Sequence, residues 1–181
     1  MVDSIPKETL IGKPVIKPDA PDKAVGRTRY INDMVLPRML HAKIKRTDRP
    51  HARIVRLDTS KAEALPGVQA VVTADDTPML GIGVNKDNPP LKKDKVCTIR
   101  DEIAAVAAET EEIALKAVEL IEVEYEDLPA VFDPVEALKD GAPLIHDDKP
   151  GNVGLSYQTK HGDIVAAEAE SDYVLDERYN V

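Results

Sequence analysis

Apolar and polar residues alternate along parts of this chain with the period of two that is typical of β-strands. Residues 40–45 alternate aliphatic with basic side chains, which predicts a half-exposed strand. A second strand is expected over residues 52–58, where the alternation changes phase between Ile54 and Leu57. A β-bulge would produce this change of phase.

Helical periodicity is clearest after Thr110, which is a favourable N-cap residue. Ile113, Ala117 and Leu120 share one face of the predicted helix 110–120, whose first turn carries acidic residues that the helix dipole favours. A shorter helix is expected over residues 61–65, because a Pro-Gly pair follows it.

The remaining pattern predicts short elements joined by loops. Strands are expected at residues 68–73, 96–99, 103–107, 122–126, 151–161 and 173–179, and short helices at residues 135–138 and 163–170. Residues 81–94, rich in Gly, Asn, Asp, Pro and Lys, predict a long exposed loop. Residues 11–33, with proline-centred turns, predict an extended arm on another surface rather than a helix.

Composition narrows the class of protein. The 181 residues contain 43% hydrophobic and 31% charged residues, which are values of a globular chain, but only 3% aromatic residues and no tryptophan. The net charge of −9 argues against a nucleic-acid partner, which would need cations to displace phosphate counterions. Neither a signal peptide nor an apolar membrane span is evident, so we expect a cytoplasmic location and no membrane partner.

Charge is unevenly distributed along the chain. Residues 38–56 contain seven Lys or Arg residues and one acid, whereas residues 109–127 contain eight acids and one base. The two segments could be solvated faces of one domain that face each other. Alternatively, one of them is buried against another domain or subunit, where complementary charge would set orientation more than affinity.

No motif predicts catalysis, and we assign no catalytic, cofactor-binding or metal-ligating residue. The Gly81–Gly83 pair has Lys86 where a dinucleotide loop needs its third glycine. Cys97, the only cysteine, lies in an apolar pattern and is expected to be a buried, inert thiol. The acids after His146 are interpreted as a solvated turn rather than a hard-cation site.

Several segments nevertheless resemble, in order, the large subunit of the molybdenum hydroxylases, the family of xanthine dehydrogenase, aldehyde oxidase and 4-hydroxybenzoyl-CoA reductase. The similar segments are Asp19 to Tyr30 (DAPDKAVGRTRY), Pro50 to Ile54 (PHARI), Leu57 to Ser60 (LDTS), Ala64 to Val68 (ALPGV), Ile103 to Glu109 (IAAVAAE), Val123 to Val131 (VEYEDLPAV), His146 to Asn152 and Gly162-Asp163. One departure is Arg100, which stands where the family usually has glycine. If that glycine serves a turn with positive φ, an arginine would strain it.

The resemblance implies an α+β fold, the α/β-hammerhead, with a small mixed β-sheet or half-barrel and two main packed helices. It implies a flexible leader over residues 1–10, the hammerhead domain over 11–160, and over 161–181 the start of a connection to a missing molybdopterin-binding domain. We therefore expect Val181 to be a boundary inside a longer protein.

The function implied is that of an N-terminal scaffold and subunit-contact domain. The parent enzyme would hydroxylate or dehydroxylate a heterocycle, an aldehyde or an aromatic thioester with a molybdenum–pterin centre. Its partners would be the rest of its own large subunit and iron–sulfur and FAD subunits or domains. No cofactor is expected in this fragment, which alone would be catalytically silent. The alternative is a stand-alone binding or adaptor module with the same fold.

Overall fold

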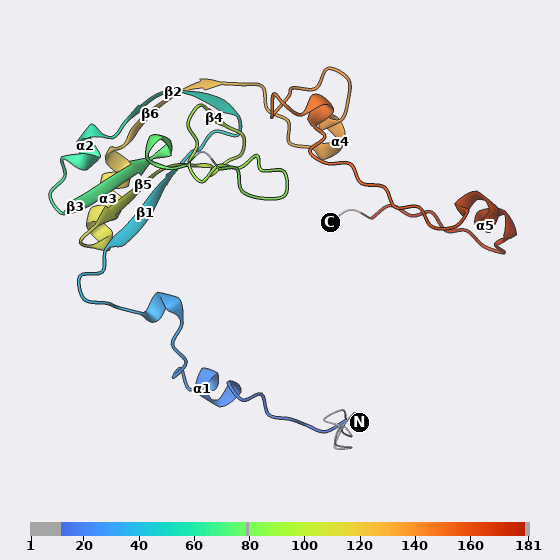
Figure 1. The fold of residues 1–181 in the computed structure, drawn as a ribbon, viewed down its shortest axis with the longest axis horizontal. Coiled ribbons are helices and arrows are strands. Elements are labelled where there is room, and N and C mark those ends of the chain that lie inside the picture. Colours follow the sequence, from blue (N-terminus) through green and yellow to red (C-terminus); the bar gives the residue numbers. More distant parts are fainter. Residues whose placement is uncertain (1–11, 79, 180–181) are drawn as a thin grey trace, which may run out of the picture.

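The computed structural model describes residues 12–78 and 80–179, so the leader predicted over residues 1–10 lies outside the described part. Two three-stranded sheets form the core (Figure 1). Sheet A has the order β1-β5-β3 and sheet B the order β4-β2-β6. The strands are β1 (His41–Arg46), β2 (Ala52–Asp58), β3 (Val68–Thr73), β4 (Lys95–Val96), β5 (Glu102–Ala108) and β6 (Glu122–Asp127).

Two helices carry the chain from one sheet to the other. Helix α2 (Ser60–Glu63) joins β2 to β3, and α3 (Glu111–Leu120) joins β5 to β6. The predicted α+β fold class with two packed helices is therefore confirmed. The prediction of a mixed sheet was wrong, because every strand pairing within residues 12–78 and 80–179 is antiparallel. Parallel neighbours would need a helical crossover within one sheet, and both helices cross between sheets.

Helix α3 packs on one face of sheet A through small side chains. Ala104 and Val106 of β5 meet Ala117 and Ile121, and Ala62 of α2 completes this buried cluster. Alanine on both sides lets the helix approach the strand closely, because only a methyl group separates the backbones. The Thr110 hydroxyl accepts a hydrogen bond from the Ile113 amide at 3.3 Å, so the predicted N-cap is confirmed.

A second buried cluster lies in sheet B and includes Ala52 and Val96, together with Ile103 from β5. Leu57 and Val123 are cross-strand partners and contact both clusters. The two sheets therefore share one continuous apolar interior. The predicted bulge in β2 is confirmed by a register shift between Ile54 and Arg56.

The turn between α2 and β3 needs its glycine. Gly67 has φ of 91°, and a Cβ atom there would lie 2.7 Å from the Ile113 side chain. The Gly67 carbonyl also accepts a hydrogen bond from the Glu109 amide at 2.9 Å. The Gly67 backbone therefore contacts both the residue before the N-cap of α3 and the first turn of that helix.

Both ends of the described chain run away from the two-sheet core (Figure 1). The arm contains the helix α1 (Ala20–Ala24) and a 3-10 turn, η1 (Ile31–Asp33), so the prediction that it lacks helix was wrong. Pro21 fits the first turn of α1, and Lys23 forms an ion pair with Asp19 at 2.6 Å. In the tail, residues 128–179 after β6, the helices α4 (Pro134–Ala137) and α5 (Ile164–Glu170) confirm the predicted short helices.

Three predictions of extended structure need correction. Residues 151–161 form the end of a 3-10 turn, η3 (Pro150–Asn152), and irregular chain, and residues 173–179 form no strand. Neither segment pairs with another strand among the described residues, and a strand needs a partner for its backbone hydrogen bonds. β4 ends at Val96 instead of continuing to residue 99, for a reason given below.

The loop predicted over residues 81–94 is confirmed in its lack of regular strand, but it is not exposed throughout. Leu91 and Lys92 are buried, because the Lys92 amide donates a hydrogen bond to the Glu102 carbonyl at 2.7 Å. No helix in residues 12–78 and 80–179 combines the length and apolarity needed to cross a bilayer.

The close contact between α3 and β5 predicts a stability effect. We expect Ala117→Leu to lower the free energy of unfolding by about 1–3 kcal/mol, because it inserts three carbons where the side chain is fully buried. Urea unfolding followed by far-UV circular dichroism would measure this. Lys116→Leu, exposed on the same helix, is the control. Equal effects of both variants would contradict the packing argument.

Candidate functional site

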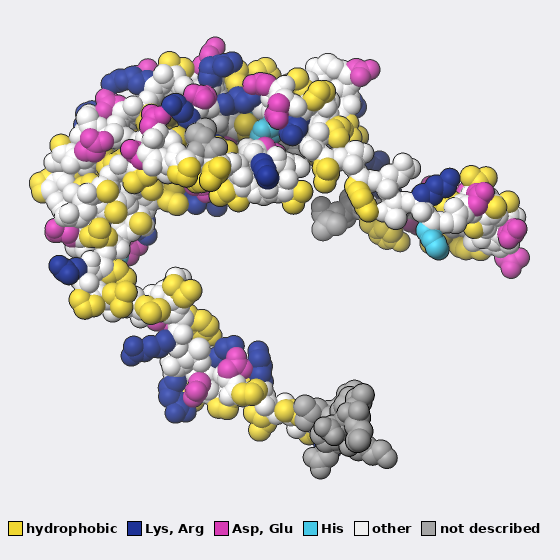
Figure 2. Space-filling view, viewed as in Figure 1, with side chains coloured by type: hydrophobic (Ala, Val, Ile, Leu, Met, Phe, Trp, Pro, Cys, Tyr) yellow, Lys and Arg dark blue, Asp and Glu magenta, His cyan; other side chains and the backbone are white. Residues whose placement is uncertain are grey.

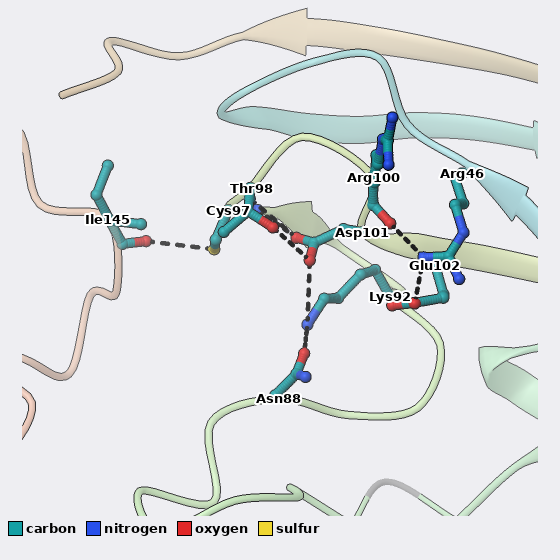
Figure 3. Close-up of polar contacts among 9 residues, drawn as sticks. All are labelled: Arg46, Asn88, Lys92, Cys97, Thr98, Arg100, Asp101, Glu102 and Ile145. Atoms are coloured by element: carbon teal, nitrogen blue, oxygen red, sulfur yellow. Dashed lines mark hydrogen bonds and ion pairs between the residues drawn. The ribbon is translucent and has the colours of Figure 1, made fainter. Parts of the chain in front are cut away.

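Two of the four buried polar side chains among the described residues, Lys92 and Asp101, meet at the turn between β4 and β5 (Figure 3). This turn, residues 97–101, is here called the Asp101 turn. The Asp101 carboxylate accepts hydrogen bonds from the backbone amides of Cys97 at 2.7 Å and Thr98 at 3.1 Å. It also accepts one from the Thr98 hydroxyl at 3.0 Å. These bonds occupy two successive backbone amides, one of which a longer β4 would need for pairing with β2, so β4 ends at Val96.

Arg100 adopts the positive φ for which glycine would be suited, with φ of 75°. The turn is therefore kept despite the side chain, at a cost of about 1–2 kcal/mol for an L-residue. Its backbone is held on both sides: the amide donates to the Thr47 carbonyl at 3.0 Å, and the carbonyl accepts from Arg46 Nη1 at 2.9 Å. Arg46 also pairs with Glu102.

Lys92 extends into the Asp101 turn from the preceding loop (Figure 3). Lys92 Nζ lies 3.9 Å from Asp101 Oδ1 and donates a hydrogen bond to Asn88. The Lys92 and Asp101 side chains are only 8% and 9% exposed. Removal of one charge would leave the other buried without its partner, which is costly.

A pocket of about 230 Å³ opens beside this pair, and Cys97 and His146 contribute to its lining. Burial raises the pKa of the Cys97 thiol, so the thiol is neutral near pH 7. Cys97 Sγ donates to the Ile145 carbonyl at 3.6 Å. The prediction of an inert thiol fits this environment, although Cys97 is half-buried and lies just beyond the strand.

The acidic turn after His146 is solvated, as predicted. Asp147 and Asp148 side chains are 88% and 74% exposed and pair with Lys95 at 3.0 Å and Lys149 at 3.5 Å. The hydrogen bond from Lys95 lowers the pKa of Asp147. Across residues 12–78 and 80–179, no three His, Cys, Asp or Glu side chains gather in a way that could hold a metal ion.

Two polar residues have structural roles that periodicity could not reveal. Asn152, at φ of 57°, donates to the carbonyls of Ala137 and Pro143 at 3.0 and 2.9 Å and accepts from the Ile145 amide at 2.9 Å. His51 Nδ1 lies 2.6 Å from the Pro129 carbonyl. Both residues belong to segments singled out by resemblance, which was the one available signal for them.

The basic and acidic segments face each other across the domain. Lys43 of β1 pairs with Glu111 of α3 at 2.5 Å. Arg53 and Arg56 of β2 pair with Glu126 and Glu124 of β6 at 3.6 and 2.9 Å. Arg49, which precedes β2, pairs with Asp127 at the end of β6 at 3.5 Å. The first of the two interpretations of the charge pattern is therefore confirmed for these pairs. The Lys43 ammonium also lowers the pKa of Glu111.

Comparison with known proteins identifies the fold. The family model described as "Aldehyde oxidase and xanthine dehydrogenase, a/b hammerhead domain" matches residues 25–129. A probable xanthine dehydrogenase subunit of Bacillus subtilis is 44% identical over 95% of this chain and 23% of its own length. The nicotinate dehydrogenase large molybdopterin subunit of Eubacterium barkeri is 38% identical over 94% of this chain and 40% of its own length.

Solved structures agree with these relatives. Quinoline 2-oxidoreductase from Pseudomonas putida 86 superposes with a TM-score of 0.68 at 35% identity, over 76% of this chain and 19% of that one. The chain thus spans about a quarter and two fifths of the length of the two relatives above, and about a fifth of this solved chain.

The buried pair in the Asp101 turn predicts a large effect of charge removal. We expect Asp101→Ala to lower the free energy of unfolding by about 3 kcal/mol, because Lys92 keeps its buried charge. Asp75→Ala breaks the neighbouring but exposed pair with Lys93 and should lower the free energy of unfolding far less than Asp101→Ala does, because solvent screens exposed ion pairs. Urea unfolding of both variants tests this, and a similar loss in both would show that burial does not decide the effect.

The left-handed backbone at Arg100 predicts a stabilising substitution. We expect Arg100→Gly to raise the free energy of unfolding by about 0.5–1 kcal/mol, since glycine adopts positive φ without strain and both backbone hydrogen bonds remain. The gain is partial because glycine also makes the unfolded chain more flexible. Ile99→Gly, next to it and without positive φ, should be destabilising. A lower thermal midpoint for Arg100→Gly would show that the arginine side chain outweighs the strain.

Proposed function

The chain belongs to the family of aldehyde oxidase and xanthine dehydrogenase α/β-hammerhead domains, and from this membership we propose that it works as the N-terminal domain of a molybdenum hydroxylase large subunit. The match over residues 25–129 carries this proposal, because it encloses every strand of both sheets and helix α3. The hammerhead domain would comprise residues 11–160, and residues 161–181 would begin the connection to a molybdopterin-binding domain.

The role proposed for this domain is structural. Its polar groups stabilise turns and join strands. The Asp101 carboxylate, for example, accepts three hydrogen bonds from its own turn. The Cys97 thiol is neutral. These side chains suit a rigid scaffold that positions neighbouring domains. They offer neither an activated nucleophile nor a general base.

The molybdenum–pterin centre of the enzyme would lie outside this chain. Metal-ligating side chains do not gather in the described residues, and the resemblance assigns no pterin-binding residue here. The centre would supply the redox chemistry of hydroxylation. Electrons would leave through iron–sulfur clusters and FAD carried by partner subunits or domains, in a cytoplasmic complex compatible with the free thiol of Cys97.

For the substrate, we favour a nitrogen heterocycle. Two of the relatives are named as a probable xanthine dehydrogenase subunit and a nicotinate dehydrogenase subunit. Xanthine and nicotinate share a ring nitrogen next to an electron-poor carbon, which is a position open to hydroxylation. The substrate pocket itself would belong to the pterin-binding part of the subunit.

This proposal predicts a difference between the isolated chain and the complex. We expect the purified 181 residues to contain no molybdenum by mass spectrometry of metals and to reduce no dye with xanthine or nicotinate. The same chain, tagged in its native host, should be purified with molybdenum, pterin and dye-linked activity toward a heterocycle.

The control is the untagged host carried through the same purification. Molybdenum retained by the 181 residues alone would contradict the scaffold role. A tagged preparation that contains the chain but neither molybdenum nor pterin would contradict membership of the enzyme and favour a stand-alone module.

A further inference from the structure

Strand β1 presents its side chains in the opposite sense to that expected from its alternation. Its lysines lie under α3: Lys43 pairs with Glu111 at 2.5 Å, and Lys45 Nζ donates to the Val118 carbonyl at 3.2 Å. The apolar residues between them are exposed, and Ile44 is 42% accessible. The apolar side of β1 therefore points away from the helix.

The register of sheet A shows that this side continues across all three strands. Ile44 lies opposite Ala105, which lies opposite Val72. Two residues away along each strand, Ala42 lies opposite Ala107, which lies opposite Ala70. The face turned away from α3, here called the uncovered face, consists of Ala42, Ile44, Ala70, Val72, Ala105 and Ala107.

The uncovered face has the composition of an interface. It contains no charged or polar side chain, yet all six residues are exposed or only half-buried. Ala105 and Ala107 lie on the central strand and are still accessible, so the described residues do not cover them. Contiguous apolar surface of this kind marks a contact site, and the four alanines would let a partner approach the sheet closely.

The uncovered face continues into the arm. Leu40 and Met39, just before β1, are 44% and 37% exposed, and further exposed aliphatic side chains follow the arm and the tail, as the hydrophobic atoms in Figure 2 show. The arm runs away from the two sheets and does not fold back over them (Figure 1). A partner must therefore be large enough to cover a face and an extended arm together.

We propose that the uncovered face is the docking surface for the molybdopterin-binding remainder of the large subunit. This inference rests on the proposed function. The relatives supply the required size, since this chain spans only 23% and 40% of their length. A second copy of this chain is less suited, because pairing of two such faces would leave both arms and tails exposed.

Cysteine labelling in the assembled enzyme tests this. Ile44→Cys and Ala105→Cys, each combined with Cys97→Ser, would place a single thiol on the uncovered face. Leu115→Cys in the same background is the matched control, because Leu115 is an aliphatic residue on α3 with 47% exposure, close to the 42% of Ile44. Each variant is purified from the native host with its bound polypeptides and treated with a maleimide.

We expect labelling at positions 44 and 105 to be about tenfold slower than at position 115 in the complex, and to become comparable after denaturation. Equal rates in a complex that contains molybdenum would overturn the docking surface and leave the proposed function intact. Absence of molybdenum from every preparation would instead overturn the proposed function. Protection in a preparation that native mass spectrometry shows to hold only copies of this chain would assign the face to self-association and overturn the inference.

Discussion

The close packing of strand β5 against helix α3 is the constraint on which the rest of the structure depends. Ala104 and Val106 of β5 form one buried cluster with Ala117 of α3, and larger side chains on this face of β5 would push the helix away from the strand. The same strand pairs with both β1 and β3 and contributes Ile103 to the second cluster. Its position is set at its start by the Asp101 turn, because Asp101 fixes the chain immediately before the first residue of β5.

The charges follow from this arrangement rather than determine it. Ion pairs such as Arg56 with Glu124 lie on the exposed surface, where solvent screens them and each contributes little to stability. They join strands that the apolar interior already brings together, and opposite charges across β2 and β6 favour one register over its neighbours. The buried Lys92–Asp101 pair differs, since desolvation makes its loss costly even though its net contribution to stability is small.

Local signals in the sequence predicted most of the core. Thr110 and the stripe beginning at Ile113 predicted α3, and the phase shift after Ile54 predicted the bulge in β2. Alternation alone could not show which side of β1 faces the helix, because the lysine amines reach acceptors on α3 that are about seventy residues away in sequence. The Asp101 turn was also beyond prediction, since the contact between Asp101 and Lys92 depends on the tertiary fold.

The inverted polarity of β1 has a physical basis that links stability to assembly. Lys43 and Lys45 have long aliphatic stems that cover part of the helix–sheet boundary, while their amines reach Glu111 and the carbonyl of Val118 in the last turn of α3. The lysines thereby provide the contacts of β1 with α3, and the aliphatic residues of β1 are not needed on the helix side of sheet A. Those residues are left for the opposite face, where four of the six residues of the uncovered face are alanines, whose exposure costs little. The domain can therefore complete its core before a partner arrives, and still present an apolar surface to that partner.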